Sequence, residues 1–228
     1  MVVDGEEAKA TQVAALHAQG KLVLAYVSVG TIEPGRPWYR AAKPYRLDRY
    51  EEYDEYYAKL SSPGFRRLIT SRVTPPMLDK GFDGLFLDNT AMIEGHKRQR
   101  AGMHRLAGEL AALTHGRGKL LFTQNGEDVI GPSLRHYDGW NREDLSQTYS
   151  FEHGRYERVP REDTRDAQRA LRRISARGLL VTASDYTRRG DARGQGRAVR
   201  AACRAGALPF VTNIQLTRIA RSPFLCPA

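Results

Sequence analysis

The sequence predicts one α/β domain over residues 1–228, with eight parallel strands closed into a (β/α)8 barrel. The first reason is a repeated order of segments: an amphipathic helical stretch, a glycine, a short apolar run and then polar residues. The second is size, because 228 residues with 41% hydrophobic composition are enough to bury one large core. The third is that no Gly-, Ser- or Pro-rich linker divides the chain.

The repeated order of segments is clear in five places, HAQG-KLVLAYVSVG, LDKG-FDGLFLDN, HGRG-KLLFTQNG, SARG-LLVTASDY and CRAG-ALPFVTN. Each glycine suits the left-handed position just past a helix end, and each apolar run is β-rich and of strand length. These glycines are Gly20, Gly81, Gly118, Gly178 and Gly206. The two widest gaps between them are about double the others, which predicts one further unit in each.

The two further strands are expected near residues 56–60 and 137–141, and the MVVD stub at the N-terminus completes the eight. An open, doubly wound sheet is the alternative, because alternation of strands and helices does not establish closure. We expect the first strand to be incomplete, and the last helix, after Arg218, to be short or missing.

Helices are expected over residues 6–18, 64–80, 99–115, 161–177 and 196–204. Pro75 and Pro76 interrupt the second of these. Because proline lacks a backbone N–H and clashes with the preceding turn, that helix should stop or kink near Thr74 and restart with a proline in its first turn.

Several classes of protein do not fit this sequence. No window approaches ~18 uninterrupted apolar residues, and the N-terminus lacks the pattern of a signal peptide. The net charge of +10 is spread over arginine-rich segments with interleaved acids, which favours solvated helix faces over a nucleic-acid site. Cys203 and Cys226 are expected to be free thiols, since a bridge would require the end of the chain to fold back.

The histidines lie on predicted helices and loops without ligand spacing, so no metal site is expected. No G-x-S-x-G elbow, P-loop or G-x-G-x-x-G stretch is present, so no phosphate or dinucleotide cofactor is expected. Instead, the predicted strands end in carboxylates, amides, hydroxyls and aromatic residues, at the edge where barrels carry their chemistry. Such an edge is typical of a sugar-binding protein.

Asp88 ends an apolar strand and lies on the same face as Phe82 and Phe86. A dry, unpaired carboxylate there would cost several kcal/mol, so Asp88 either caps the following helix or acts in catalysis. Hydrolysis of a glycosidic bond requires two carboxyl groups, one to protonate the leaving oxygen and one as nucleophile or base. Glu143 is the first choice for the partner and Glu152 the second, with a solvated loop acid as the structural alternative for either.

Four segments resemble the endo-α-1,4-polygalactosaminidase family of glycoside hydrolases, family 114, and its bacterial relatives. They are YVSVGTIEPGRPWY (26–39), GFDGLFLDN (81–89), YDGWNREDL (137–145) and GALPFVTNIQLTRI (206–219). The resemblance implies a (β/α)8 barrel that cleaves galactosamine-containing polysaccharide with two acids, which fall on Asp88 and Glu143. Asp144 and Glu152 compete with Glu143 for the second role.

The residues expected to bind substrate are Tyr26, Ser28, Glu33, Arg36, Trp38, Asn89, Asn125, Trp140, Asp185, Tyr186 and Asn213. Of these, Trp38 and Trp140 are expected to stack on sugar rings. We expect a monomer whose partner is a polysaccharide or oligosaccharide, with no nucleic acid, metal or cofactor; the resemblance suggests a secreted or periplasmic location. The alternative is a catalytically inactive carbohydrate-binding barrel.

The charge raises a question about this substrate, because a deacetylated galactosamine polymer is cationic and a basic protein would repel it. Either the glycan is acetylated, neutral or acidic, or the local potential is negative where the acids of the strand ends converge.

Overall fold

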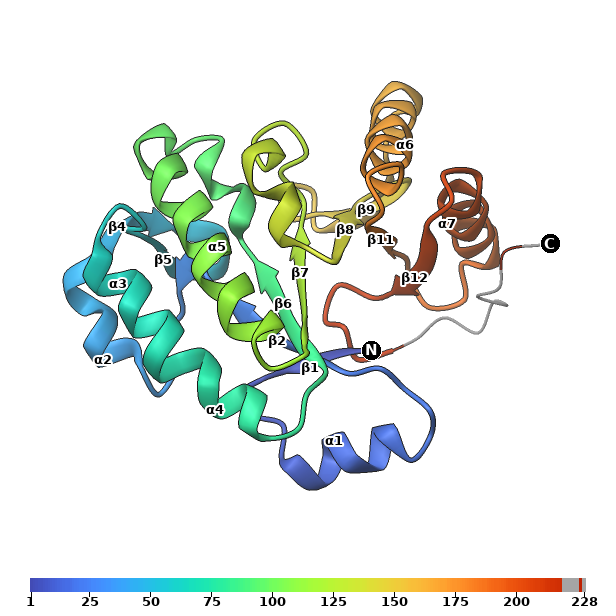
Figure 1. Cartoon of the computed structure of the whole chain (residues 1–228). Coiled ribbons are helices and arrows are strands. Elements are labelled where there is room, and N and C mark those ends of the chain that lie inside the picture. The colour runs from blue at the N-terminus through green and yellow to red at the C-terminus, as the bar shows by residue number, and fades with distance from the viewer. Residues whose placement is uncertain (219–225, 227–228) are drawn as a thin grey trace. The chain divides into compact units, whose positions relative to one another are not determined.

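The computed structural model of the chain describes residues 1–218 and 226, and it contains parallel strands, short antiparallel strands and helices (Figure 1). Contacts between Cα atoms divide the chain into two compact units, residues 1–138 and 139–228. The prediction of a single domain over the whole chain therefore stays a prediction.

The first unit contains four parallel strands in the order β1-β2-β6-β7. They are β1 (Val2–Asp4), β2 (Leu24–Ser28), β6 (Gly84–Asp88) and β7 (Leu120–Gln124). Leu24, Phe86 and Phe122 of adjacent strands form an apolar cluster beneath the strand ends. At Gly84, an added Cβ would lie 2.1 Å from the Leu120 carbonyl oxygen, so only glycine permits this approach of β6 and β7. The first strand has three residues, as short as expected.

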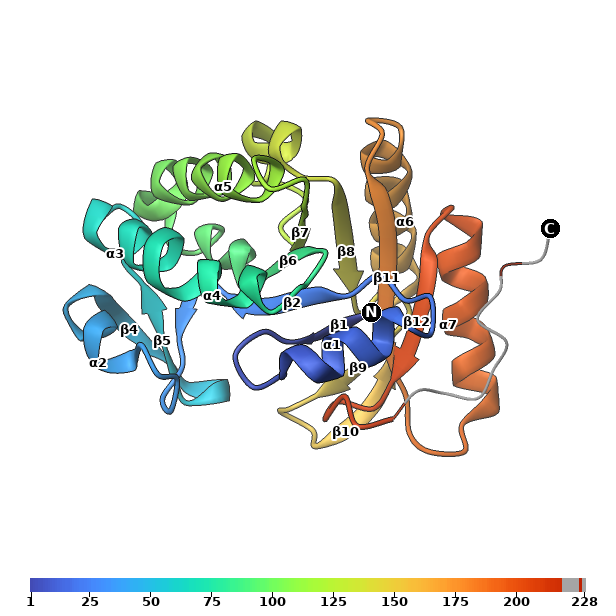
Figure 2. The ribbon, with the colours of Figure 1, turned by 60° about the horizontal axis from the view of Figure 1, so that its bottom comes forward.

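The prediction that residues 56–60 form the third barrel strand is wrong. This segment is β5 (Glu55–Ala58), which pairs antiparallel with β3 (Thr31–Ile32) and β4 (Arg46–Tyr50) in a separate small sheet (Figure 2). The reason is the length of the connections. Only a short 3₁₀ turn, Glu51–Tyr53, and Asp54 join β4 to β5, whereas a parallel pair needs a crossover of about a dozen residues.

The helices of the first unit are α1 (Ala10–His17), α2 (Tyr39–Ala42), α3 (Pro63–Leu68), α4 (Thr74–Asp79) and α5 (Arg100–His115). A π-helical turn over Ile69–Val73 separates α3 from α4, and α4 begins at Thr74 with both prolines in its first turn. The predicted interruption at this point is confirmed. Short 3₁₀ helices occur at Lys43–Tyr45, Thr90–Ile93, Lys97–Gln99 and Gly131–His136.

The second unit has three parallel strands, β8 (Gly139–Glu143), β11 (Leu180–Tyr186) and β12 (Leu208–Thr212). Its other elements are a hairpin of β9 (Gln147–Ser150) and β10 (Arg155–Arg158), and the helices α6 (Arg161–Ser175) and α7 (Ala192–Arg204). The strand predicted over residues 137–141 exists as β8, two residues further on. The part of the chain that the structure describes thus has seven parallel strands where eight were predicted.

All five glycines that precede the predicted strands have the expected left-handed backbone, with φ from 64° to 98°. Helix α7 begins four residues earlier than predicted, because the Asp191 carboxylate accepts a hydrogen bond from the Gly194 N–H at 2.8 Å and caps the helix.

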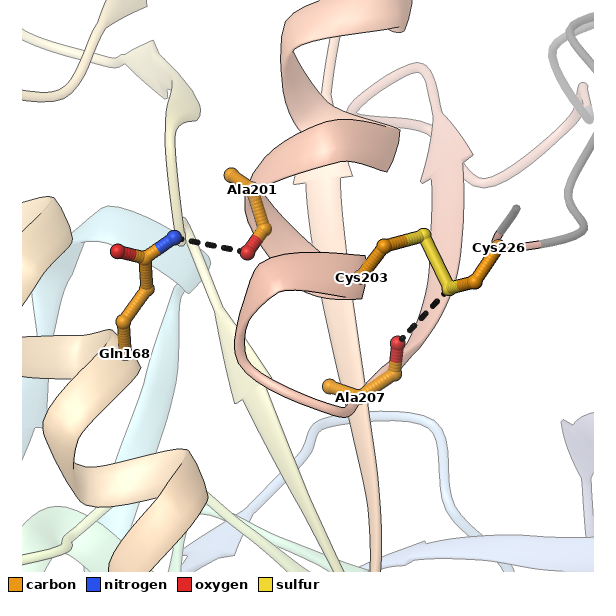
Figure 3. Close-up of a disulfide and its surroundings, with 5 residues drawn as sticks. All are labelled: Gln168, Ala201, Cys203, Ala207 and Cys226. Atoms are coloured by element: carbon orange, nitrogen blue, oxygen red, sulfur yellow. Dashed lines mark hydrogen bonds between the residues drawn. A yellow bond between two sulfur atoms is a disulfide. The ribbon is translucent and has the colours of Figure 1, made fainter. Parts of the chain in front are cut away.

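The prediction of two free thiols is wrong, because Cys203 of α7 and Cys226 form a disulfide with a Cα–Cα distance of 5.3 Å (Figure 3). Cys226 therefore lies beside α7, although it is 23 residues away from Cys203 in the sequence. Beside the bridge, the Gln168 amide of α6 donates to the Ala201 carbonyl of α7 at 2.8 Å. The expectation about a last helix after Arg218 lies outside the described residues. Within those residues, none of the helices combines the length and apolar character that a membrane crossing requires.

Candidate active site

The carboxylate of Asp88 is held at the end of β6 by three hydrogen-bond donors. The Tyr26 hydroxyl of β2 donates to Oδ2 at 2.7 Å, and the Gln124 amide of β7 donates to Oδ1 at 2.9 Å. The Asn89 backbone N–H also donates to Oδ1, at 2.6 Å. The N-cap position of the 3₁₀ helix that follows is occupied by Asn89, not by Asp88. The partners of Asp88 on the two flanking strands favour a functional carboxylate over the helix cap.

Burial dominates the electrostatics of Asp88 and raises the pKa of its carboxyl group above the ordinary value. The hydrogen bonds from Tyr26, Asn89 and Gln124 act in the opposite direction, because they stabilise the ionised form. The pKa of the Tyr26 phenol is also raised, through burial and the charge of Asp88. Tyr26 therefore remains a proton donor to Asp88 throughout the ordinary pH range.

The turn after β6 packs tightly against the end of β2. Asn89 has a left-handed backbone with φ 58°, and its side-chain amide donates to Ser28 Oγ and Thr31 Oγ1, each at 3.0 Å. An added Cβ at Gly30 would lie 1.8 Å from the Asn89 carbonyl oxygen, so glycine is needed at this contact. Ser28 is buried, and its hydroxyl oxygen is hydrogen-bonded to the Thr31 hydroxyl oxygen at 2.6 Å. Ser28 and Asn89 thus support the turn, which does not fit their predicted role in binding sugar.

Glu33 and Arg36, which were both predicted to bind substrate, form an ion pair. The Arg36 guanidinium also contacts two further carboxylates. Its Nε lies 2.5 Å from Glu33, and its NH1 lies 2.7 Å from Asp4 and 3.3 Å from Glu6. One guanidinium therefore faces three carboxylates, and the local charge is negative when all of them are ionised. Trp38, next to this group, is buried at 8% exposure and offers little ring surface for stacking.

Glu143 is the last residue of β8 in the second unit, and it has a tyrosine partner as Asp88 does. The Tyr186 hydroxyl, at the end of the adjacent strand β11, donates to Glu143 Oε1. Tyr186 is almost buried, at 8% exposure. In each unit, then, a strand-end carboxylate accepts a hydrogen bond from a phenol on a neighbouring parallel strand.

Asp185 is 1% exposed, which does not fit its predicted contact with substrate. Its Oδ1 accepts hydrogen bonds from the backbone N–H groups of Ser146 and Gln147 at 2.7 and 2.5 Å. Burial raises the pKa of Asp185 to about 7, although these hydrogen bonds oppose the shift. Asp185 therefore orients the segment that follows Glu143.

Trp140, Asn213 and Asn125 were also predicted to contact substrate, and each has a different environment. Trp140 is fully buried, so its ring presents no accessible face, which does not fit the predicted stacking on a sugar. Asn213 donates to Gln215 and Thr217 within its own turn, at 2.7 and 2.9 Å. Asn125 occupies a left-handed position directly after β7, with φ 53°.

The small antiparallel sheet carries Glu55, Tyr50 and Tyr57, which the sequence did not predict as site residues. Continuing the antiparallel pairing of β3 with β5 places Glu55 opposite Glu33, and the charges of Glu33 and Asp88 both raise the pKa of Glu55. The short Glu51–Tyr53 turn between two β-rich segments was the signal that a hairpin presents these side chains. In the described part of the chain, no group of three or more His, Cys, Asp or Glu residues is arranged to hold a metal ion.

Parallel strands flanked by helices, with carboxylates and phenols at the carboxyl ends of the strands, are the features of a barrel-type glycoside hydrolase. The family model of glycoside-hydrolase family GH114 matches residues 1–222, and the chain belongs to this family. No curated protein sequence matches the chain.

The fold is shared with several solved structures, among them the following two. The glycoside hydrolase domain of PelA from Pseudomonas aeruginosa has a TM-score of 0.79 and 21% identity, with 95% of this chain and 88% of that chain covered. Ega3 of Aspergillus fumigatus, solved in complex with galactosamine, has a TM-score of 0.73 and 20% identity, with 94% and 84% covered. The predicted α/β fold of the TIM-barrel type is confirmed by this likeness.

Proposed function

We propose that the protein is a glycosidase that cleaves a galactosamine-containing polysaccharide in the manner of an endo-α-1,4-polygalactosaminidase. Asp88 is the nucleophile or stabilising carboxylate, and Glu143 is the general acid/base. The observation that carries this proposal is that each of these acids ends a parallel strand and accepts a tyrosine hydroxyl. Membership of GH114 and the galactosamine complex of Ega3 support the amino-sugar substrate.

Several features favour Glu143 over its two competitors. Glu143 ends β8, at the edge where barrel enzymes place catalytic groups. Asp144 lies one residue beyond the strand, in a left-handed conformation with φ 52°. Glu152 is exposed in the turn between β9 and β10. Its carboxylate is therefore the solvated loop acid that the sequence also allowed.

The test is depolymerisation of partially acetylated galactosaminogalactan, with released oligosaccharides detected by mass spectrometry. We expect release by the wild type and a loss of at least ~100-fold in the Glu143→Gln variant, the usual contribution of a general acid/base. The matched control is Glu152→Gln, which should keep the wild-type rate. If Glu152→Gln loses activity and Glu143→Gln does not, the assignment of the second acid is wrong. If the folded wild type releases nothing, the carbohydrate-binding alternative is favoured.

Replacing Tyr26 with phenylalanine is expected to shift the acid limb of the pH–rate profile to higher pH. The hydrogen bond from Tyr26 lowers the pKa of Asp88, so its removal raises that pKa further. A catalytic Asp88 must be ionised, and activity is therefore lost at a higher pH as the solution is acidified. The measurement is kcat/KM from pH 4 to 8, with exposed Tyr53→Phe as the control. An unchanged acid limb in Tyr26→Phe would contradict the role of Asp88.

A further inference from the structure

Helices α6 and α7 of the second unit lie side by side, and arginines are frequent on their exposed surface (Figure 1 and Figure 2). The Gln168 amide of α6 donates to the Ala201 carbonyl of α7 (Figure 3). One helical turn further on, the Arg172 guanidinium donates to the Arg204 carbonyl at 3.4 Å. These two contacts define the side of α6 that faces α7. Six exposed residues form what we call the arginine face: Arg161, Arg165 and Arg172 of α6, and Arg193, Arg200 and Arg204 of α7.

Positive and negative side chains are separated around α6. Because a helix has about 3.6 residues per turn, the three arginines of the arginine face on α6 lie within about 60° of Gln168, toward α7. The acids of this helix, Glu162, Asp163 and Asp166, lie about 120–160° from Gln168 by the same geometry. Helix α7 contains no acid between Ala192 and Arg204, and its three arginines of the arginine face lie within about 40° of one another. The adjoining sides of the two helices therefore carry positive charge alone.

This arrangement of charge is unfavourable for the helices themselves. Arg161 and Arg165 are four residues apart, as are Arg200 and Arg204, and like charges at this spacing repel each other on a helix surface. Arg193 lies in the first turn of α7, where there is no acid and where the helix dipole disfavours a positive charge. Helix stability therefore does not explain the arginine face, whereas an anion bound along it would relieve the repulsion.

The arginine face has no counter-charge within the protein and borders a recess. Within residues 1–218 and 226, no carboxylate forms an ion pair with any of its six arginines, whereas Arg169, further around α6, pairs with Asp166. Arg172 and Arg204, together with Ser175, line an open hollow of about 400 Å³ at the ends of the two helices. The other residues around the hollow are alanine and glycine, so its lining contains two guanidinium groups and no acid.

The side chains of the two helices indicate which kind of anion fits. A single strand of nucleic acid binds by stacking its bases on aromatic residues, and neither α6 nor α7 contains one. None of the large apolar side chains exposed among the described residues belongs to these helices, so a membrane surface would find no apolar anchor. A DNA duplex accepts a convex element in its major groove, whereas Arg172 and Arg204 border a recess. A single chain of sugars that carry carboxylates suits such a recess, because guanidinium binds carboxylate through two parallel hydrogen bonds.

We propose that the arginine face of α6 and α7 binds an acidic polysaccharide, a chain of uronic acid sugars, at a site separate from the strand-end carboxylates. Successive arginines of the face on each helix are four or seven residues apart, about 6 or 10.5 Å along the axis, which is comparable with one or two sugar rings. The inference does not depend on the proposed hydrolase activity. It also bears on the question of charge, because an acidic glycan is a partner that a chain with a net charge of +10 attracts.

The experiment is calorimetric titration at pH 7 with an α-1,4-linked galacturonate decamer and with its fully methyl-esterified, uncharged counterpart. We expect the wild type to bind the acidic decamer and not the ester, with an affinity that weakens as salt is added. The Arg172→Gln/Arg204→Gln variant should bind the acidic decamer at least tenfold more weakly. Its dependence on salt should also be shallower, because fewer charged contacts are formed.

The matched control is Arg98→Gln/Arg105→Gln, which removes the same charge from two exposed arginines of the first unit and should keep the wild-type affinity. Arg172→Lys/Arg204→Lys retains the charge and should lose less affinity than the glutamine variant, which separates charge from damage to the fold. A wild type that binds neither decamer, or binds both equally, would overturn the inference. So would an equal loss in the control variant, or tighter binding of a DNA duplex than of the acidic decamer, which would assign the arginine face to nucleic acid.

Discussion

Replacing Asp88 with asparagine is expected to lower kcat by about 1,000-fold or more, which corresponds to about 4 kcal/mol of transition-state stabilisation. Asparagine has nearly the same shape, and its carbonyl oxygen still accepts hydrogen bonds from Gln124 and the Asn89 N–H. The Tyr26 hydroxyl can rotate to accept from the new amide. The fold should therefore persist while the negative charge required for catalysis is lost.

The measurement is the rate of reducing-end formation from galactosaminogalactan, with thermal unfolding recorded for each variant. Asp79→Asn is the matched control, since Asp79 is a surface carboxylate at the end of α4 that pairs only with Arg117 among the described residues. It should retain wild-type activity. A folded Asp88→Asn variant that keeps more than about a tenth of the wild-type rate would contradict the role of Asp88, because a missing nucleophile costs far more.

Replacing Asp185 with alanine is expected to lower the free energy of unfolding by roughly 2–6 kcal/mol. The substitution leaves the backbone N–H groups of Ser146 and Gln147 without their acceptor, and an unsatisfied buried donor costs about 1–3 kcal/mol. Ser146 and Gln147 are themselves buried. Asp185→Asn keeps the accepting oxygen and should lose much less. Denaturant unfolding of the two variants measures the difference, and equal losses would refute this account.

The same site should make the stability of the protein depend on pH. The pKa of Asp185 rises from its usual value of about 4 to about 7 in the folded chain, so the native state binds this proton more tightly than the unfolded state. The contribution of Asp185 to the free energy of unfolding is therefore greatest below pH 4 and declines as the pH rises to 7. The wild type should lose stability relative to Asp185→Asn over this interval. A difference that is constant between pH 4 and 7.5 would contradict the raised pKa of Asp185.

Much of the fold could be predicted from residue preferences that act over a few positions of the chain. The five glycines that precede the predicted strands have the left-handed conformations that glycine adopts most readily. Helix α4 begins at Thr74 because the two prolines that follow cannot continue the preceding helix but fit the first turn of a new one. The error at β5 has a different origin. Strand propensity predicts that a segment is extended, but pairing depends on the length of the connections and on distant partners.

The candidate site likewise contains residues that the sequence predicted and residues that it did not. Asp88 was predicted because a carboxylate at the end of an apolar strand is conspicuous in the sequence, and Glu143 because it follows the less regular strand expected near residues 137–141 and matches the family resemblance. Glu55 was missed because it lies in a three-stranded antiparallel sheet that was not predicted. Trp140 and Asp185 were expected to contact substrate, yet both are buried, since side-chain exposure depends on packing by residues far away in the chain.

By itself, the sequence determined the α/β class, the positions of most helices and strands, and the strand ends that carry acids. These features follow from periodicity, glycine and proline, which act over a few residues. Only the tertiary structure decided the partners of those side chains: the tyrosine on each strand-end acid, the guanidinium shared by three carboxylates and the disulfide at Cys226. Burial and hydrogen-bond partners arise from contacts between distant segments, and these contacts set both pKa values and access to substrate.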